Sequence, residues 1–105
     1  MSGADKDEIQ SFLQLIVTTT KNQRLALFRN ITPKQCHIIR QVAYNILINT
    51  SIQLTPKDRS YLRNSIDLLK QLASRRVEIN EKREILLKRH LLVKKIAAIA
   101  LQYLR

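Results

Sequence analysis

Basic side chains dominate the residues of this sequence that could carry out chemistry. Six of them fall within 14 residues near the C-terminus, at Lys82, Arg83, Lys88, Arg89, Lys94 and Lys95, and Arg75 and Arg76 precede them. On a helix the six would extend over about 20 Å, which is enough to reach several phosphates of one duplex. Successive bases would project about 100° apart, so they surround a helix rather than line one face of it. This pattern favours binding of a polyanion through charge, without reading of a base sequence.

Side chains that could support catalysis or metal binding are few. Cys36 and His37 are adjacent, so a helix would point them about 100° apart, and His90 is distant in the sequence. The single cysteine excludes an intramolecular disulfide and a multi-cysteine zinc site, and it is typical of a small core residue. One glycine in the whole chain leaves no glycine-rich loop for phosphates. We therefore expect no enzyme activity, no metal site and no cofactor.

The composition indicates a single all-α domain over residues 1–105. Nineteen Lys and Arg against eight Asp and Glu give a formal charge of +11. Hydrophobic residues make up 45% of the chain, which is too much for a disordered basic tail. With so few glycines and prolines, the chain also lacks the turns that β-sandwiches and hairpin barrels need.

The charge is distributed unevenly along the chain. Residues 1–20 carry a net charge of −2, residues 21–56 carry +5, and residues 57–105 carry +8. This gradient suggests that a polyanionic partner approaches from the C-terminal end. The N-terminus lacks the pattern of a secretory signal, and no run of about 18 uncharged apolar residues is present, so we expect neither a signal peptide nor a membrane span.

Five helices are predicted from their start signals and their apolar periodicity. The start signals are Asp5 with Glu8, Thr20 with Gln23, Thr32 with Pro33 and Gln35, Thr55 with Pro56 and Asp58, and Asn80. The fourth helix is predicted to run to Ala73, with core positions Leu62, Ile66, Leu69 and Ala73. The fifth is predicted over 81–104. Short links favour a compact four- or five-helix bundle with a long basic and apolar C-terminal helix within residues 80–104.

The end of the last predicted helix is apolar around its full circumference. Such a helix must be buried on several sides. Three interpretations stay open: the end packs inside the bundle, it forms a surface for self-association or for a partner, or it inserts into a membrane interface. Packing inside the bundle is favoured, and insertion into a membrane is the least favoured. The residues concerned are Ile96, Ile99, Leu101, Tyr103 and Leu104.

The order of these segments resembles a short basic protein encoded by Polinton/Maverick transposons and adintoviruses, which are adenovirus-like elements of animals. The resemblance covers residues 18–95. The matching motifs are Gln23-Arg24-Leu25, Asn45-Ile46-Leu47, Leu54-Thr55-Pro56, Leu72-Ala73, and Lys82-Arg83 with Leu86-Leu87. The family's glycine-rich stretch before its apolar tail is missing here, which argues against a membrane-disrupting role. The resemblance implies a small protein of the virion, present in the host nucleus or cytoplasm during assembly, that is a genome-condensing core protein or a minor capsid component.

Charge and resemblance lead to one expected function and one alternative. The expected function is sequence-independent binding and packaging of viral double-stranded DNA by the eight bases Arg75, Arg76, Lys82, Arg83, Lys88, Arg89, Lys94 and Lys95. The alternative is a structural interaction protein, either a minor capsid component or a self-associating adaptor. It would dock through the apolar C-terminal residues onto a capsid protein or a second copy.

Overall fold

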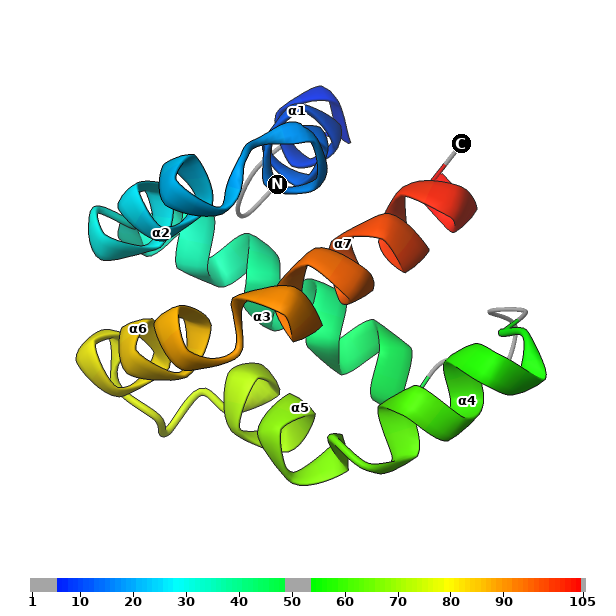
Figure 1. Ribbon diagram of the computed structural model, residues 1–105. Coiled ribbons are helices and arrows are strands. Elements are labelled where there is room, and N and C mark those ends of the chain that lie inside the picture. The colour runs from blue at the N-terminus through cyan, green and yellow to red at the C-terminus, as the bar shows by residue number, and fades with distance from the viewer. Residues whose placement is uncertain (1–5, 49–53, 105) are drawn as a thin grey trace.

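Seven α-helices account for most of the part of the chain that the structure, a computed structural model, describes, namely residues 6–48 and 54–104 (Figure 1). No strand occurs within these residues. The expected all-α class is confirmed, with more and shorter helices than the predicted bundle. The helices are α1 (Lys6–Thr18), α2 (Lys21–Arg29), α3 (Pro33–Ile48), α4 (Pro56–Arg63), α5 (Ile66–Ala73), α6 (Ile79–Lys88) and α7 (His90–Leu104).

Side-chain caps fix the starts of three helices, as predicted. At α2 the hydroxyl of Thr20 accepts the backbone N–H of Gln23 at 3.3 Å, and the Gln23 side chain accepts the N–H of Thr20 at 3.0 Å. The same reciprocal pair joins Thr32 and Gln35 at the start of α3, with both bonds at 3.1 Å. Thr55 caps α4 with one such bond. These bonds satisfy N–H groups that have no partner within the helix. The cap predicted at Asp5 lies outside the described residues.

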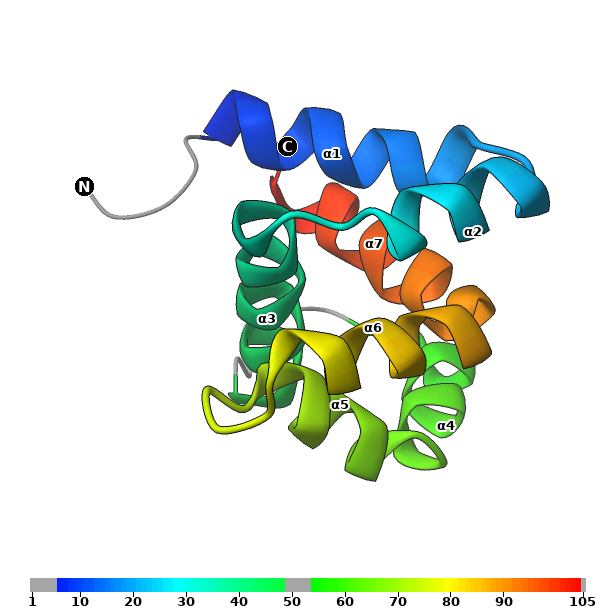
Figure 2. The ribbon, with the colours of Figure 1, turned by 90° about the vertical axis from the view of Figure 1, so that its left-hand side faces the viewer.

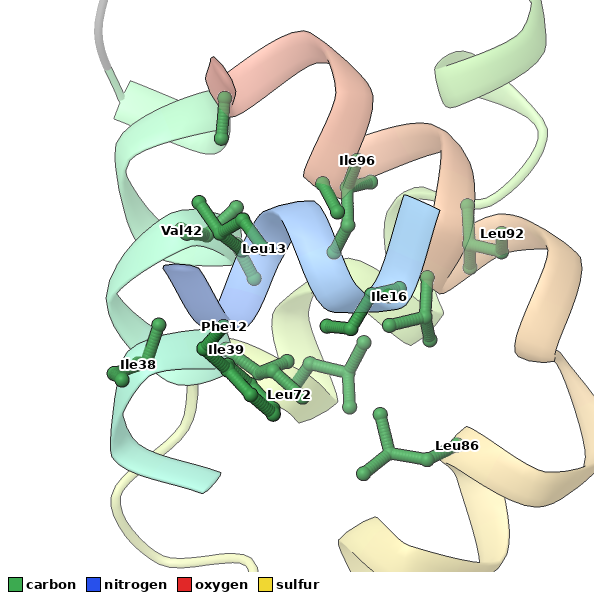
Figure 3. Close-up of a cluster of buried hydrophobic side chains, with 14 of the residues drawn as sticks. Phe12, Leu13, Ile16, Ile38, Ile39, Val42, Leu72, Leu86, Leu92 and Ile96 are labelled. Carbon is green, nitrogen blue, oxygen red and sulfur yellow. The ribbon is translucent and has the colours of Figure 1, made fainter. Parts of the chain in front are cut away.

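Two helix pairs form the centre of the bundle. α1 packs against α7, and α3 packs against α5, while α6 contacts α2, α3 and α5 (Figure 2). The buried side chains come from every one of these elements and form one core cluster (Figure 3). Its most deeply buried large members are Leu13, Ile16, Phe28, Leu69, Leu72, Leu86, Leu92, Val93 and Ile96. The radius of gyration is 12.7 Å, close to the value of about 13 Å for a compact domain of this length.

The predicted helix over 81–104 is wrong as a single element, because the chain bends at Arg89. This residue has φ −120° and ψ 42°, outside the helical region, and it separates α6 from α7. Both halves contact α3, but α6 also packs against α2 and α5 whereas α7 also packs against α1, so the bend gives each half neighbours that the other lacks. The start is also earlier than predicted: α6 begins at Ile79, and Asn80 lies in its first turn rather than at its cap.

A second bend divides the helix that was predicted to run from Pro56 to Ala73. α4 ends at Arg63 and α5 begins at Ile66, with the buried Ser65 between them at φ −118° and ψ 16°. Leu62 and Leu69 are buried as predicted. Ile66 is 43% exposed, which corrects its predicted core position. The reason is that Ser65, between Leu62 and Ile66, leaves the helical path.

Candidate nucleic-acid interface

Four basic residues from three segments gather where α3 passes α6. They are Arg40 on α3, Arg75 in the link 74–78, and Lys82 and Arg83 on α6, and together they are called the α3–α6 cluster. The charges of Arg40, Arg75 and Lys82 all act on the neighbouring ring of His37. Those of Lys82 and Arg83 act on Cys36, one position earlier on α3. The packing of α3 against both α5 and α6 explains this convergence, because it returns the link and α6 to the same side of α3.

Hydrogen bonds hold two of the cluster's guanidinium groups. Nε of Arg40 donates to Nδ1 of His37 one turn earlier on α3, at 3.4 Å. Nη1 of Arg83 donates to the Asn80 side chain at 2.7 Å, and Nε of Arg83 is buried without a hydrogen-bond partner. Arg40 and Arg75 line opposite sides of an open hollow between α3 and the end of α5, together with the polar residues Gln41, Tyr44 and Asn45.

Lys82 is the most enclosed charge of the cluster, with only 5% of its surface exposed. Burial lowers the pKa of its ammonium group and the charge of Arg40 lowers it further, while Cys36 acts in the opposite direction. Burial raises the pKa of the Cys36 thiol above its usual value, although Lys82 and Arg83 act in the opposite direction. The thiol therefore stays neutral near pH 7 and gives Lys82 no negative partner.

Carboxylates do not neutralise the α3–α6 cluster. Within the described residues the ion pairs are Lys34 with Glu8 at 2.7 Å and Lys95 with Asp58 at 2.8 Å, and neither involves the cluster. The pKa of His37 is lowered by burial first, and then by Arg40, Arg75 and Lys82, which favours the uncharged imidazole beside them. The cluster is thus a region of concentrated positive charge that no ion pair of the described residues neutralises.

The eight predicted DNA contacts differ in accessibility. Arg75, Arg76, Lys88 and Arg89 are exposed, whereas Arg83 and Lys94 are half-buried. Lys95 is half-buried and held in its ion pair with Asp58. Lys82 differs from the other seven, because α6 turns this position inward toward α3 and leaves only 5% of the residue exposed.

The exposed contacts form two groups, one at each end of α6. Arg75 and Arg76 precede its first turn, while Lys88 is its last residue and Arg89 follows directly. α6 has 10 residues, so the groups are separated by a helix of about 15 Å. Arg89 lies over the bend between α4 and α5, since its Nη2 donates weakly to the Ser65 hydroxyl at 3.5 Å. The exposed bases therefore form two separate positively charged groups, and the predicted continuous helix over 81–104 is interrupted at Arg89.

The apolar residues predicted to dock a partner lie largely in the core. Ile96 is 1% exposed and Ile99 is 4% exposed, because α7 is enclosed by α1 and α3. Leu101 and Tyr103 are half-buried, and a hydrogen bond links the Tyr103 side chain to Asn45. The side chain of Leu104 lies outside the described residues. Packing inside the bundle is thus the interpretation that fits α7, and a partner could reach Ile96 and Ile99 only if α7 left the core.

Sequence reasoning missed two basic residues. Arg40 follows Cys36 by four positions and His37 by three, so all three share one side of α3, a spacing that could have been noticed. Arg24 gave no such signal, since it lies in a short polar helix, yet it is only 3% exposed. Its guanidinium donates to the carbonyl of Thr19 at 3.2 Å and to the ring of His90 at 3.1 Å.

Comparisons with protein-family models, curated proteins and solved structures find no match to this chain. In the described residues, no helix is long and apolar enough to cross a membrane. Histidine, cysteine and acidic side chains of the same part of the chain form no group of three that could hold a metal ion. The observations that bear on function are therefore the geometry and charge of the basic residues.

Proposed function

We propose that this protein binds double-stranded DNA without sequence specificity and packages it in a virus-like particle. The observation that carries the proposal is the exposure of Arg75, Arg76, Lys88 and Arg89 at the two ends of α6 without an ion-pair partner among the described residues. A net charge of +11 adds a long-range attraction to any polyanion.

Phosphate contacts would supply the affinity. Each lysine or arginine that neutralises a phosphate releases condensed counterions from the duplex, and this release is favourable at low salt. The two ends of α6 are separated by about 15 Å, which is similar to the width of the DNA major groove, about 12 Å. The two groups could therefore contact phosphates of both strands across one groove.

The same arrangement supports binding without base recognition. Arg75 and Arg76 lie in a link, and Lys88 and Arg89 lie at a helix end, so none of them belongs to an exposed helix face that could enter a groove. Contacts of this kind orient a protein on the duplex but carry no sequence information. The viral context rests on the order of motifs that resembles proteins of Polinton/Maverick elements and adintoviruses.

The alternative, a structural protein that docks through α7, has less support. Its predicted contacts Ile96 and Ile99 are part of the core and would have to be exposed at the cost of that packing. A sizing column run on the free protein distinguishes the two. DNA binding by a monomer supports the first function, whereas a stable dimer that fails to bind DNA supports the second.

The decisive test compares two variants of equal charge on a random 30-base-pair duplex. In the first, Arg75, Arg76, Lys88 and Arg89 are replaced by Gln. In the matched control, four exposed bases of α4 and α5 are replaced by Gln, namely Lys57, Arg59, Arg63 and Lys70. We expect the first variant to lose at least tenfold more affinity in a retardation assay than the control. Equal losses of affinity in the two variants would show that DNA binding depends only on net charge. The ends of α6 would then not be the binding site.

A further inference from the structure

We propose that the α3–α6 cluster is a binding site for a single phosphate group, formed by Lys82, Arg40 and Arg75 with the help of Arg83. This goes beyond DNA binding by exposed bases, because the site is enclosed and discrete, and it would exist even if the chain bound no DNA.

The first argument is that a buried charge here has no counter-ion. Enclosing an ammonium group away from water costs several kcal/mol unless a negative group compensates for it. Lys82 is 5% exposed, its nearest titratable neighbour on α3 is the neutral thiol of Cys36, and no ion pair of the described residues includes it. An anion from solution would supply the missing partner.

The second argument is an unused donor. Nε of Arg83 is buried and has no hydrogen-bond partner, although the same guanidinium is fixed through Nη1 by Asn80. Buried N–H groups are almost always satisfied in folded proteins, and an unsatisfied one costs about 1–3 kcal/mol. The charges of Arg83 and of the buried Lys82 both act on Cys36, so this unused donor belongs to the same cluster beside α3.

The charge and donor count favour phosphate over a carboxylate. Lysine and arginine side chains only donate, and the cluster concentrates four of them, of which Arg40 and Arg83 each use one donor on a neutral side chain. A phosphate group offers three or four acceptor oxygens and as many as two negative charges, and planar guanidinium groups bind it in a bidentate manner. The open hollow lined by Arg40 and Arg75 provides access, and the side chains of Gln41, Tyr44 and Asn45 make its wall polar.

The phosphate group could belong to a nucleic-acid backbone or to a small soluble phosphate compound. Both present negatively charged non-bridging phosphate oxygens to the cluster, two from a backbone phosphodiester and more from a small phosphate compound, so the cluster could bind either of them. The experiment therefore has one arm with inorganic phosphate and one arm with duplex DNA, so that failure of the phosphate site and failure of the proposed function are distinguishable.

In the first arm the thermal unfolding midpoint of the full chain is measured against inorganic phosphate, with sodium chloride at equal ionic strength as the reference. A ligand at about ten times its Kd should raise the midpoint of a domain of this size by about 5 °C. The test variant is Lys82→Met, which keeps the volume and removes the buried charge. The matched control is Lys88→Met, the same substitution at an exposed position of α6.

We expect a saturable rise for the wild-type chain and for Lys88→Met, and no rise for Lys82→Met. Without phosphate, Lys82→Met should unfold at the same or a higher temperature, because a buried uncompensated charge has been removed. Arg40→Gln, at a half-buried position, should weaken the response at least threefold and serves as a second variant should Lys82→Met not fold. The proposed site would be contradicted if phosphate did not raise the unfolding midpoint of the wild-type chain, or raised it equally in all variants.

The second arm measures the duplex affinity of the wild-type chain, Lys82→Met and Arg40→Gln. If a backbone phosphate occupies the site, Lys82→Met weakens DNA binding and reduces the salt slope by about 1, while the inorganic phosphate response is also lost. If only the inorganic phosphate response is lost, the site stands and belongs to a soluble phosphate compound. Phosphate binding by a wild-type chain that fails to bind DNA would keep the site and contradict the proposed function.

Discussion

The guanidinium of Arg24 donates to Nδ1 of His90, 66 positions along the chain, and so connects α2 to the first residue of α7. The Nη2–Nδ1 distance is 3.1 Å and the Nε–Nδ1 distance is 3.4 Å. Nδ1 can accept these bonds only when it carries no proton, so the bonds select a neutral imidazole with its hydrogen on Nε2. Because His90 follows the bend at Arg89, the same contact holds α7 in its direction relative to α6.

Acidification should therefore destabilise the protein. Burial and the nearby charges of Arg24 and Lys21 lower the pKa of His90 in the folded state. As the pH falls below the ordinary value of about 6.5, the unfolded chain takes up the proton first, and the free energy of unfolding decreases. Above that value His90 is neutral in both the folded and the unfolded chain, so its contribution to the free energy of unfolding does not change with pH. We expect a lower thermal midpoint at pH 5.0 than at pH 7.5.

His90→Gln is the matching variant, since its amide oxygen can accept from Arg24 at any pH. It should reduce the loss of stability between pH 7.5 and 5.0. His37 shifts in the same direction, so the double variant with His37→Gln should respond least to pH. A wild-type midpoint that does not move across this interval would contradict the neutral imidazole at the bend.

Arg24 should contribute more to stability than its polar sequence context suggests. Arg24→Ala leaves the carbonyl of Thr19 and the ring of His90 without a donor and opens a cavity, so we expect a cost of about 2–4 kcal/mol in urea denaturation. Arg29→Ala removes an exposed arginine from the same helix and should change stability by less than about 0.5 kcal/mol. Equal effects of the two substitutions would show that the burial of Arg24 does not contribute to stability.

The helix starts could be predicted from the sequence, whereas the bends could not. The side chains of Thr20, Thr32 and Thr55 each accept a hydrogen bond from the backbone N–H three residues on, so a local sequence pattern is enough to predict these starts. The bend at Arg89 has no proline or glycine. It results from the packing of α6 and α7 against different helices, and such long-range contacts leave no mark in a local pattern.

The ion pair between Lys95 and Asp58 predicts a second, more acidic transition. The hydrogen bond from Lys95 is the main cause that lowers the pKa of Asp58, with a further bond from Thr55. The pair's contribution is present above the ordinary carboxyl pKa of about 3.9 and is lost as the pH falls through the lower folded value. Asp58→Asn should cost about 0.2–1 kcal/mol at pH 7, because Lys95 is partly exposed to solvent.

A double-mutant cycle with Lys95→Met measures this coupling directly. Asp58→Asn also releases the Lys95 ammonium group, so duplex affinity should stay the same or rise. A fall in duplex affinity would argue against binding through Lys95 and its neighbours.

The apolar end of α7 should behave as core. Ile96→Ala removes a side chain that is 1% exposed, and we expect a loss of about 2–5 kcal/mol in urea denaturation. Leu91→Ala, on the same helix but at a position that is 61% exposed, should cost less than about 1 kcal/mol. If Ile96→Ala instead left stability intact and altered the oligomeric state, α7 would be a docking surface.

The sequence predicted the basic residues of the candidate site but not their accessibility. Arg75 and Arg76 are exposed where a basic link was expected, yet Lys82 points inward and Lys95 is paired. Which face of a helix is buried depends on the elements that pack against it. α3 packs against α6 although the two helices are distant in the sequence. The same reason explains why Arg40 was overlooked: it joins the cluster through tertiary packing alone.

The dependence of duplex affinity on salt tests the central claim most directly. The dissociation constant on random duplex DNA would be measured at several sodium chloride concentrations with wild-type protein. Neutralisation of about six phosphates predicts a slope of about −5 for the logarithm of affinity against the logarithm of salt. The variant with Arg75, Arg76, Lys88 and Arg89 replaced by Gln should have a slope reduced by about 3 or 4. A flat salt dependence in the wild-type chain would contradict binding through these basic side chains.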